Sequence, residues 1–301
     1  MNTQPHCAKT NLGLVCITLS DAVRFKTITR KRLLSFDEAG QAELLHTLYA
    51  ENVQRLQAAL EFCQSHSIQL YRMTSALFPF SDEPFGAQIL ADNFATSLAA
   101  IGRQALNQGI RLVLHPDQYV VLTSDSPTVI ENSIKILQMH ANIMDLLGQP
   151  RSEWAAMMIH GGKSERSDTM VKTIDSLPEA IRSRLVLEND EHAYSAQAIL
   201  AICRRAQVPM VFDAHHHICH EGLEEYDHPS VREAFWAART TWANPEHQLV
   251  HISNGRERFA DRAHSDLIYT MPDVYRFAAW IEVEAKHKEL AIEKLQKEWL
   301  T

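Results

Sequence analysis

The feature that most constrains this chain is a repeated alternation of short apolar segments with longer amphipathic ones. Most of the apolar segments lack the apolar–polar alternation of a half-exposed strand, as expected for strands buried on both faces. The predicted strands span residues 12–19, 68–73, 110–115, 155–160, 184–189, 209–213, 248–253 and 280–284. The predicted helices span residues 41–65, 87–108, 128–147, 170–182, 195–206 and 229–238.

Eight strands that alternate with helices predict a closed TIM (β/α)8 barrel, which is an α/β fold. We expect a single domain over residues 1–301, with a core of about 11–286 and a C-terminal helix at 286–300. Periodicity alone leaves 273–299 open between a strand and one long helix. An open doubly wound sheet is the alternative. However, no GxGxxG or GxxxxGK[ST] loop follows a strand, so we expect no nucleotide cofactor.

Composition excludes several other classes of protein. Hydrophobic residues make up 46% of the chain and charged residues 22%, which is typical of a globular protein and not of a disordered one. No apolar run approaches the roughly 20 residues of a membrane span, and residues 1–11 lack the apolar core of a signal peptide. We therefore expect a cytoplasmic protein. Five cysteines without a CxxC pair argue against a disulfide framework or a thiolate zinc site.

Histidines and carboxylates occur where the predicted strands end. The third to eighth strands contain or end in His115, His160, Glu188, Asp213, His251 and Glu284. A single histidine at a strand end is more often a hydrogen-bonded structural residue than a ligand. Six such positions in register are different, because polar groups that converge at the mouth of a barrel repel each other or lose solvation unless something binds them.

Divalent cations would satisfy this convergence. Imidazole and carboxylate groups suit zinc, manganese or iron, and the number of donors exceeds the need of one ion. His216 follows Asp213 in a D-x-x-H pair, which can direct both side chains into one site. His264 lies in a polar loop and would be read as a solvated residue without the cluster. His215, His216 and His217 are adjacent and cannot all face one metal.

Two loops carry weaker signals for DNA. Lys26 and Arg30 belong to a run of basic residues after the first strand, which is either a solvated loop or an edge that contacts phosphate. Gln118 and Tyr119 follow the third strand and could stack on and hydrogen-bond a base. The net charge of −8 argues against a broad surface that coats nucleic acid but allows a local basic groove.

These residues occur in motifs whose order resembles that of the UvdE/UvsE family of UV damage endonucleases. The resemblance extends from Leu12-Gly13 to Glu284-Ala285-Lys286 and favours a strand at 280–284. The main motifs are His115-Pro116-Asp117-Gln118-Tyr119, His160-Gly161-Gly162, Leu187-Glu188-Asn189-Asp190, Asp213-Ala214-His215-His216-His217, His251-Ile252-Ser253, Ala263-His264 and Val283-Glu284-Ala285-Lys286.

The resemblance implies a TIM barrel similar to endonuclease IV and a metal-dependent hydrolase. Its implied reaction is incision of duplex DNA immediately 5′ of UV photoproducts and other distorting lesions, leaving a 3′-hydroxyl and a 5′-phosphate. It implies a cluster of up to three divalent ions, with manganese favoured and zinc or magnesium as alternatives. The implied metal ligands are His115, His160, Glu188, Asp213, His216, His251, His264 and Glu284. Glu188 would be the bridging ligand of the catalytic centre, because a carboxylate has two oxygens to share.

The resemblance also implies a partner and a mode of recognition. Gln118 and Tyr119 would probe the lesion in damaged double-stranded DNA, because photoproducts weaken stacking and pairing and are easier to extrude. We expect a monomer that acts in the cytoplasm, associated with the nucleoid in a bacterium. Asn189 and Asp190 are candidates for orienting the ligating imidazoles.

The chain departs from the family pattern at three places. Some members have a carboxylated lysine that bridges metals two residues before the histidine of the seventh strand, where this chain has Leu249; Asp261 or Asp266 could supply a carboxylate instead. Leu14 and Thr18 stand where some members have a Tyr and an Asn. Asp117 replaces a frequent Gly before the Gln-Tyr pair.

Two other functions remain open at this point. One is a metal-dependent sugar isomerase or epimerase of the xylose-isomerase-like barrel type. It would need a small enclosed pocket, whereas a DNA enzyme needs a basic rim. The other is a lesion-binding protein without catalytic activity, which would bind without metal and leave the strand intact.

Overall fold

The computed structural model describes residues 9–300, so Cys7 and most of the segment considered for a signal peptide lie outside the described residues. Eight parallel strands pair in chain order and close into a barrel, which confirms the predicted fold class. The strands are β1 (Asn11–Val15), β2 (Leu70–Met73), β3 (Arg111–Leu114), β4 (Met157–His160), β5 (Leu185–Glu188), β6 (Met210–Asp213), β7 (Leu249–Ile252) and β8 (Trp280–Val283).

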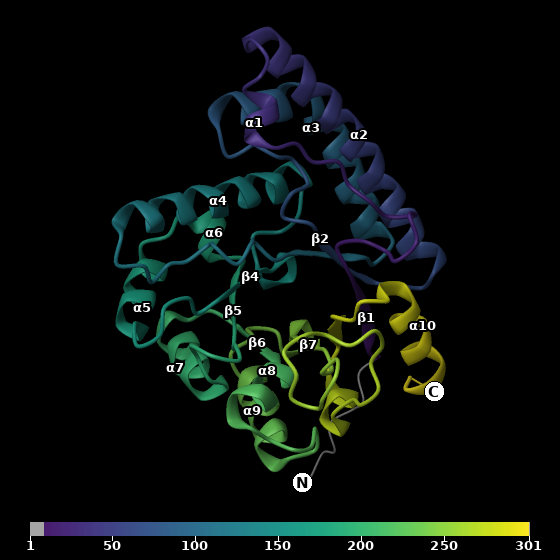
Figure 1. Cartoon of the computed structure of the whole chain (residues 1–301), viewed down its shortest axis with the longest axis vertical. Helices are drawn as coiled ribbons and strands as arrows, with labels where there is room; N and C mark the ends of the chain where they lie inside the picture. The colour runs from purple at the N-terminus through teal and green to yellow at the C-terminus, as the bar shows by residue number, and fades with distance from the viewer. Residues whose placement is uncertain (1–8, 301) are drawn as a thin grey trace.

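Helices surround this barrel (Figure 1). They are α1 (Arg30–Leu33), α2 (Glu38–Ser65), α3 (Pro84–Asn107), α4 (Pro127–Leu146), α5 (Ser167–Asp175), α6 (Glu179–Arg182), α7 (Ala196–Ala206), α8 (Ala214–Glu221), α9 (Pro229–Arg239) and α10 (Lys288–Glu298). Short 3-10 turns lie at Glu153–Ala155, Pro245–His247 and Asp273–Phe277. Within residues 9–300, no helix combines the length and apolar character needed to cross a bilayer.

Two predicted elements differ from the observed ones, and the strand favoured at 280–284 is confirmed. The predicted helix at 170–182 is two helices, because Pro178 lies between them and cannot donate a backbone hydrogen bond. The predicted first strand ends early, at Val15, because Cys16 has a φ of 63°, which extended backbone does not adopt. The segment 273–299 is divided into a 3-10 turn, β8 and α10, so it is not one long helix.

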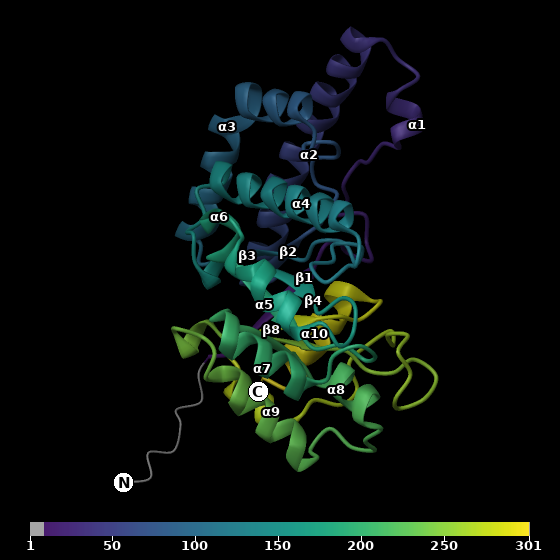
Figure 2. The same ribbon diagram turned by 90° about the vertical axis from the view of Figure 1, so that its left-hand side faces the viewer.

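The two ends of the chain meet where the barrel closes. β1 pairs with β8, and α10 lies against β1 (Figure 1). The Glu289 carboxylate accepts backbone N–H groups of Leu19 and Ser20 at 2.6 and 3.0 Å. Figure 2 shows α2 and α3, which pack side by side, extending away from the barrel and carrying the α1 region with them.

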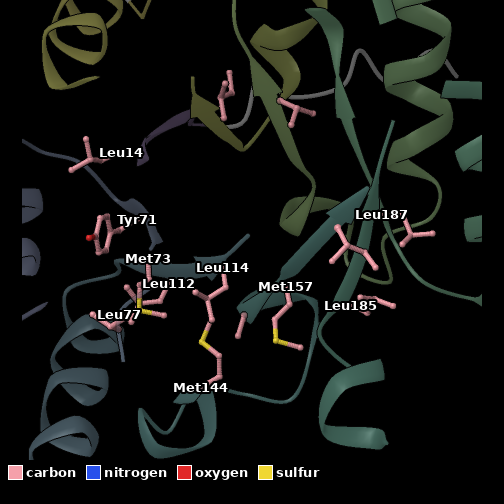
Figure 3. Close-up of a cluster of buried hydrophobic side chains, with 14 of the residues drawn as sticks. Leu14, Tyr71, Met73, Leu77, Leu112, Leu114, Met144, Met157, Leu185 and Leu187 are labelled. Atoms are coloured by element: carbon pink, nitrogen blue, oxygen red, sulfur yellow. The ribbon is translucent and has the colours of Figure 1, made fainter. Parts of the chain in front are cut away.

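Outward-facing strand residues form the larger core. Leu112 and Leu114 on β3 face the helices, and Met144 of α4 lies next to Leu114 (Figure 3). Each buried side chain of this kind contributes about 1.5–3 kcal/mol relative to an exposed one. Side chains alternate across a strand, so the residues between these point into the barrel.

The inward-facing residues form layers. An apolar layer includes Leu70, Val113, Met158, Val186, Val211 and Leu249. Residues two positions further along the same strands face the same way, one layer closer to the carboxyl ends. Those residues are Arg72, His115, His160, Glu188, Asp213 and His251. On β1, the residue in register with Leu70 is Gly13. A side chain does not fit there, because a Cβ atom would lie 2.6 Å from Leu70 Cδ2.

A buried arginine closes the amino-terminal end of the barrel. The Arg111 side chain is fully buried and donates to the carbonyl oxygens of Glu153, Trp154 and His247 at 2.7–2.8 Å. Its guanidinium carbon lies 5.2–5.7 Å from the ring centroids of Trp154, Trp242 and Trp280. Arginine suits this position because its planar cation stacks on aromatic rings and still satisfies several acceptors.

We predict that Arg111→Met destabilises the protein by more than about 3 kcal/mol, because it leaves three buried carbonyl groups without a donor. Arg103 is exposed on α3, and Arg103→Met should change the free energy of unfolding by less than about 0.5 kcal/mol. Urea unfolding followed by circular dichroism measures both. Equal stability of the two variants would contradict the structural role assigned to Arg111.

Candidate metal centre

The eight residues expected to bind metal lie together at the carboxyl ends of the strands. Seven of them form three groups whose potential ligand atoms lie within 4.8 Å of one another. The groups are His115–His160–Glu188, Glu188–Asp213–His216 and Asp213–His251–Glu284. His264 joins them from the loop after β7, with Nδ1 3.8 Å from Glu284 Oε2. The convergence follows from the inward register of β3 to β8.

Glu188 lies at the centre of this cluster and is 1% exposed. Its Oε2 atom is 3.2 Å from His115 Nε2 and 3.8 Å from His160 Nε2. Its Oε1 atom is 3.0 Å from His251 Nδ1 and 3.4 Å from His216 Nδ1. The two oxygens therefore face different imidazoles, as a carboxylate shared between two positive centres would.

The electrostatics favour a charged carboxylate among positive groups. Burial by itself would raise the pKa of Glu188, but the imidazoles of His251 and His160 hold this pKa well below its usual range. Burial would lower the pKa of His251, but Glu188 and Glu282 hold it well above its usual range. The pKa of His216 is likewise raised by Asp213 and Glu188 against the effect of burial. Burial lowers the pKa of His160.

The D-x-x-H pair is placed by the start of α8. Asp213 is the N-cap of this helix, and its Oδ1 accepts the His216 N–H at 2.8 Å. The Asn189 carbonyl oxygen lies 3.0 Å from His216 Nδ1, while the Asn189 side chain binds the backbone of Asp213. Asn189 therefore contacts the His216 ring through its main chain. Asp190 does not, because its carboxylate accepts backbone N–H groups of residues 192–194.

The adjacent histidines point away from the cluster, as the sequence predicts. His215 Nδ1 lies 2.7 Å from the Tyr226 hydroxyl, and His217 Nε2 lies 3.0 Å from Ser230 Oγ. Successive helical residues project in different directions, so only His216 of the three reaches the centre.

The donor set fits divalent cations. Asp213 Oδ2 and His160 Nδ1 are buried and have no hydrogen-bond partner within residues 9–300. Such groups are costly unless they are bound. Cys16 lines the same cleft, but burial raises the pKa of its thiol and it belongs to none of the three donor groups. Carboxylates and imidazoles without thiolate suit manganese, zinc or iron.

The carboxylate suggested for Asp261 or Asp266 is supplied by neither residue. Asp261 accepts the N–H groups of Glu257 and Ala263, and Asp266 lies 3.7 Å from His287. A further buried carboxylate is Glu282 on β8. It lies in register with His251 of β7, the strand that also carries Leu249. Arg72 and Glu282 were missed by the sequence reasoning. The strand period of two could have identified both. Arg72 comes two residues after Leu70, and Glu282 comes two residues before Glu284.

The cluster opens into a cleft of about 630 Å³. Gln118 and Tyr119 line this cleft, and Tyr119 is 63% exposed. The Tyr119 hydroxyl donates to Asp117 Oδ2 at 2.5 Å, which raises the pKa of Tyr119 to about 12. The other oxygen of Asp117 accepts a hydrogen bond from Ser75 Oγ at 2.6 Å. Asp117, at a frequent glycine position, thus ties the tyrosine to the loop after β2.

The basic residues lie at different distances from this cleft. Lys26 pairs with Glu51 at 2.6 Å and does not line it. Arg30 pairs with Glu83 and lines a smaller pocket that shares Ser75, Asp117 and Tyr119 with the cleft. A further edge near His264 carries three exposed arginines at 256, 258 and 262.

A scan against protein families matches residues 10–300 to the family model described as UV-endonuclease UvdE. This chain belongs to the UvdE family. It is 57% identical over 295 residues to the UV DNA damage endonuclease of Nostoc sp., covering 97% of this chain and 91% of that one. The crystal structure of SacUVDE superposes with a TM-score of 0.82 at 27% identity, covering 96% of this chain and 98% of that one. Endonuclease IV of Thermus thermophilus shares the fold at 15% identity, with a TM-score of 0.59 and coverage of 81% and 94%.

We predict that Mn²⁺ binding to this UvdE-family protein releases protons and strengthens as the pH rises from about 6 to about 8. The raised pKa values of His216 and His251 keep their imidazoles protonated in the metal-free protein, so an ion must displace those protons. Isothermal titration calorimetry in buffers of different ionisation enthalpy counts the released protons. His46→Gln, on an exposed position of α2, should leave the count unchanged. Affinity that does not depend on pH would contradict this description.

Proposed function

We propose that this protein is an endonuclease that nicks duplex DNA immediately 5′ of UV photoproducts and other distorting lesions, leaving a 3′-hydroxyl and a 5′-phosphate. The observation that carries the proposal is the convergence of three donor groups on Glu188 and Asp213 beside the exposed Gln118–Tyr119 loop. Membership of the UvdE family supports it. We propose a single domain over residues 1–301 that acts as a monomer in the cytoplasm, on the nucleoid of a bacterium.

The proposed metal ligands are the eight clustered residues, and the proposed ions are up to three, with manganese favoured. Divalent ions held there lower the pKa of water and stabilise negative charge on phosphate. Glu188 would hold the centre together, because it belongs to two donor groups at once. His115 can donate from Nδ1 to the Pro116 carbonyl at 2.9 Å, which leaves its Nε2 directed at Glu188.

Recognition of the lesion is assigned to the loop after β3. A photoproduct is easier to extrude than a normal base pair, and Gln118 and Tyr119 can fill the space it leaves. Tyr119 offers a stacking face, and its hydrogen bond to Asp117 limits the orientations of the ring before DNA arrives. Arg30 is the better placed of the two predicted phosphate contacts, because it lines a pocket together with Asp117 and Tyr119, which Lys26 does not line.

The shape of the site favours DNA over a sugar. A sugar isomerase or epimerase would need a small enclosed pocket, whereas this cleft has an exposed tyrosine on its wall. The exposed arginines of the loop that carries His264 provide a basic edge near the donor groups. Both features suit a long anionic substrate.

We predict that Glu188→Ala reduces nicking of UV-irradiated supercoiled plasmid by more than about 100-fold, because losing only an outer partner of a metal ligand already costs 10- to 100-fold. Relaxation of the plasmid on an agarose gel, with manganese present, measures the rate. Unirradiated plasmid and added EDTA serve as negative controls. Glu153→Ala, at the opposite end of the barrel, should nick normally. Full nicking by the Glu188 variant would overturn the site assignment, and binding without any nicking by the wild type would favour a non-catalytic lesion binder.

The double variant Gln118→Ala/Tyr119→Ala should bind lesion-containing DNA roughly 5- to 150-fold more weakly, equivalent to one lost base–aromatic stack of about 1–3 kcal/mol. Manganese affinity should stay at the wild-type value, because neither side chain belongs to a donor group. Fluorescence anisotropy with matched damaged and undamaged duplexes separates the two effects. Equal loss of affinity for both duplexes would show that the loop does not recognise the lesion.

A further inference from the structure

A further carboxylate lies inside the barrel, at the level of His251. Glu282 on β8 is fully buried and points inward like Glu284, two residues later on the same chain. It lies in register with His251 on β7, and its Oε2 atom is 2.7 Å from His251 Nε2. Glu282 belongs to none of the three donor groups, so its contact with the cluster runs through the histidine.

Arg72 holds this carboxylate from the other side. Its Nη1 atom donates to Glu282 Oε2 at 2.9 Å and to Glu284 Oε1 at 2.5 Å. The guanidinium compensates two buried negative charges, which would otherwise repel each other and be costly to bury. Arg72 therefore links the carboxylate of the interior to a carboxylate at the mouth of the barrel.

The contact with Glu282 decides which nitrogen of His251 is directed at the cluster. A neutral imidazole donates from one ring nitrogen and accepts, or binds metal, through the other. With Nε2–H donating to Glu282, the free nitrogen is Nδ1, which lies 3.0 Å from Glu188 Oε1 and 3.5 Å from Glu284 Oε1. The other neighbour of Nε2 is Met158 Sδ at 3.1 Å, which is a weak acceptor.

We propose that Glu282, held by Arg72, is a positioning residue that orients His251 so that Nδ1 binds metal. The proposal rests on the proposed metal site but not on the identity of the substrate. A carboxylate that accepts the second N–H of a ligating imidazole fixes the ring and increases its basicity, and its removal typically weakens metal binding by about 10- to 100-fold. Arg72 supports this role, because its guanidinium donates to the Glu282 carboxylate and holds it in place.

The test compares two substitutions of Glu282 with one control substitution in another Glu–His contact. Glu282→Met fills a similar volume but accepts no strong hydrogen bond, and Glu282→Gln keeps an acceptor oxygen without the charge. The control is Glu153→Gln, because Glu153 also contacts a histidine, His247 at 3.3 Å, but at the amino-terminal end of the barrel. Calorimetric titration with Mn²⁺ alone, without DNA, gives the affinity of each purified full-length protein.

We expect Mn²⁺ affinity to fall by about 10- to 100-fold in Glu282→Met, to fall less in Glu282→Gln, and to be unchanged in Glu153→Gln. In the zinc-loaded wild type, ¹⁵N-resolved histidine spectra should show His251 with a hydrogen-bonded Nε2–H, and this proton should move in Glu282→Gln. Wild-type affinity in Glu282→Met, or a His251 bound through Nε2 in the wild type, would overturn the proposal.

Two further readouts keep the outcomes separate. If Glu282→Met does not fold, as judged by circular dichroism, then Glu282→Gln decides: an unchanged affinity and an unmoved Nε2–H signal overturn the proposal. Nicking of irradiated plasmid is measured in parallel for the wild type. Absence of nicking there counts against the proposed function, whereas the metal titrations still test the role of Glu282.

Discussion

The buried carboxylate of Glu188 is the group around which the mouth of the barrel is organised. An isolated carboxylate at 1% exposure would be strongly destabilised by the loss of water. Four imidazoles from four different segments lie 3.0–3.8 Å from its oxygens and compensate for that loss. In the metal-free protein, protonated His216 and His251 supply the positive charge that the carboxylate needs. Divalent ions would provide the same compensation, so the metal-free and metal-loaded sites can share one geometry.

The rest of the barrel keeps these donors in position. Because side chains alternate along a strand, the apolar layer of Leu70, Val113 and their neighbours leaves the next inward layer to the polar residues. Arg111 and three tryptophans fill the opposite end of the barrel, and the histidine and carboxylate donors gather at the carboxyl ends of the strands. Arg72 and Glu282 connect the packed interior to the mouth. The charged groups at the centre of the site are therefore held by contacts from several strands, while the loop that carries Tyr119 is exposed.

Much of this arrangement could be predicted from the sequence. The apolar segments predict the strands of a closed parallel barrel. The carboxyl ends of these strands meet at one mouth, so the same pattern predicts the convergence of His115, Glu188 and Asp213. The assignment of particular roles came from the resemblance to the UvdE family. Pro178 signals a helix break in the sequence, but the apolar periodicity of residues 170–182 predicted one continuous helix.

Other features depend on contacts between distant segments, which periodicity does not report. Lys26 pairs with Glu51 of α2, and the Asp261 carboxylate accepts N–H groups of its own loop, and neither contact could be predicted from periodicity. Glu282 does not stand at the end of its strand, so the strand-end pattern does not point to it, and only its contact with His251 shows its role. Strand-end patterns thus locate a site of this kind, whereas tertiary contacts decide which carboxylates support it.

The central claim is that the residues around Glu188 and Asp213 hold divalent ions. Anomalous diffraction from crystals soaked in manganese tests this most directly. We expect up to three anomalous peaks in the cleft, one for each donor group, with Glu188 and Asp213 each shared between two of them. Peaks confined to other parts of the surface, or no peak near Glu188 at saturating manganese, would contradict it.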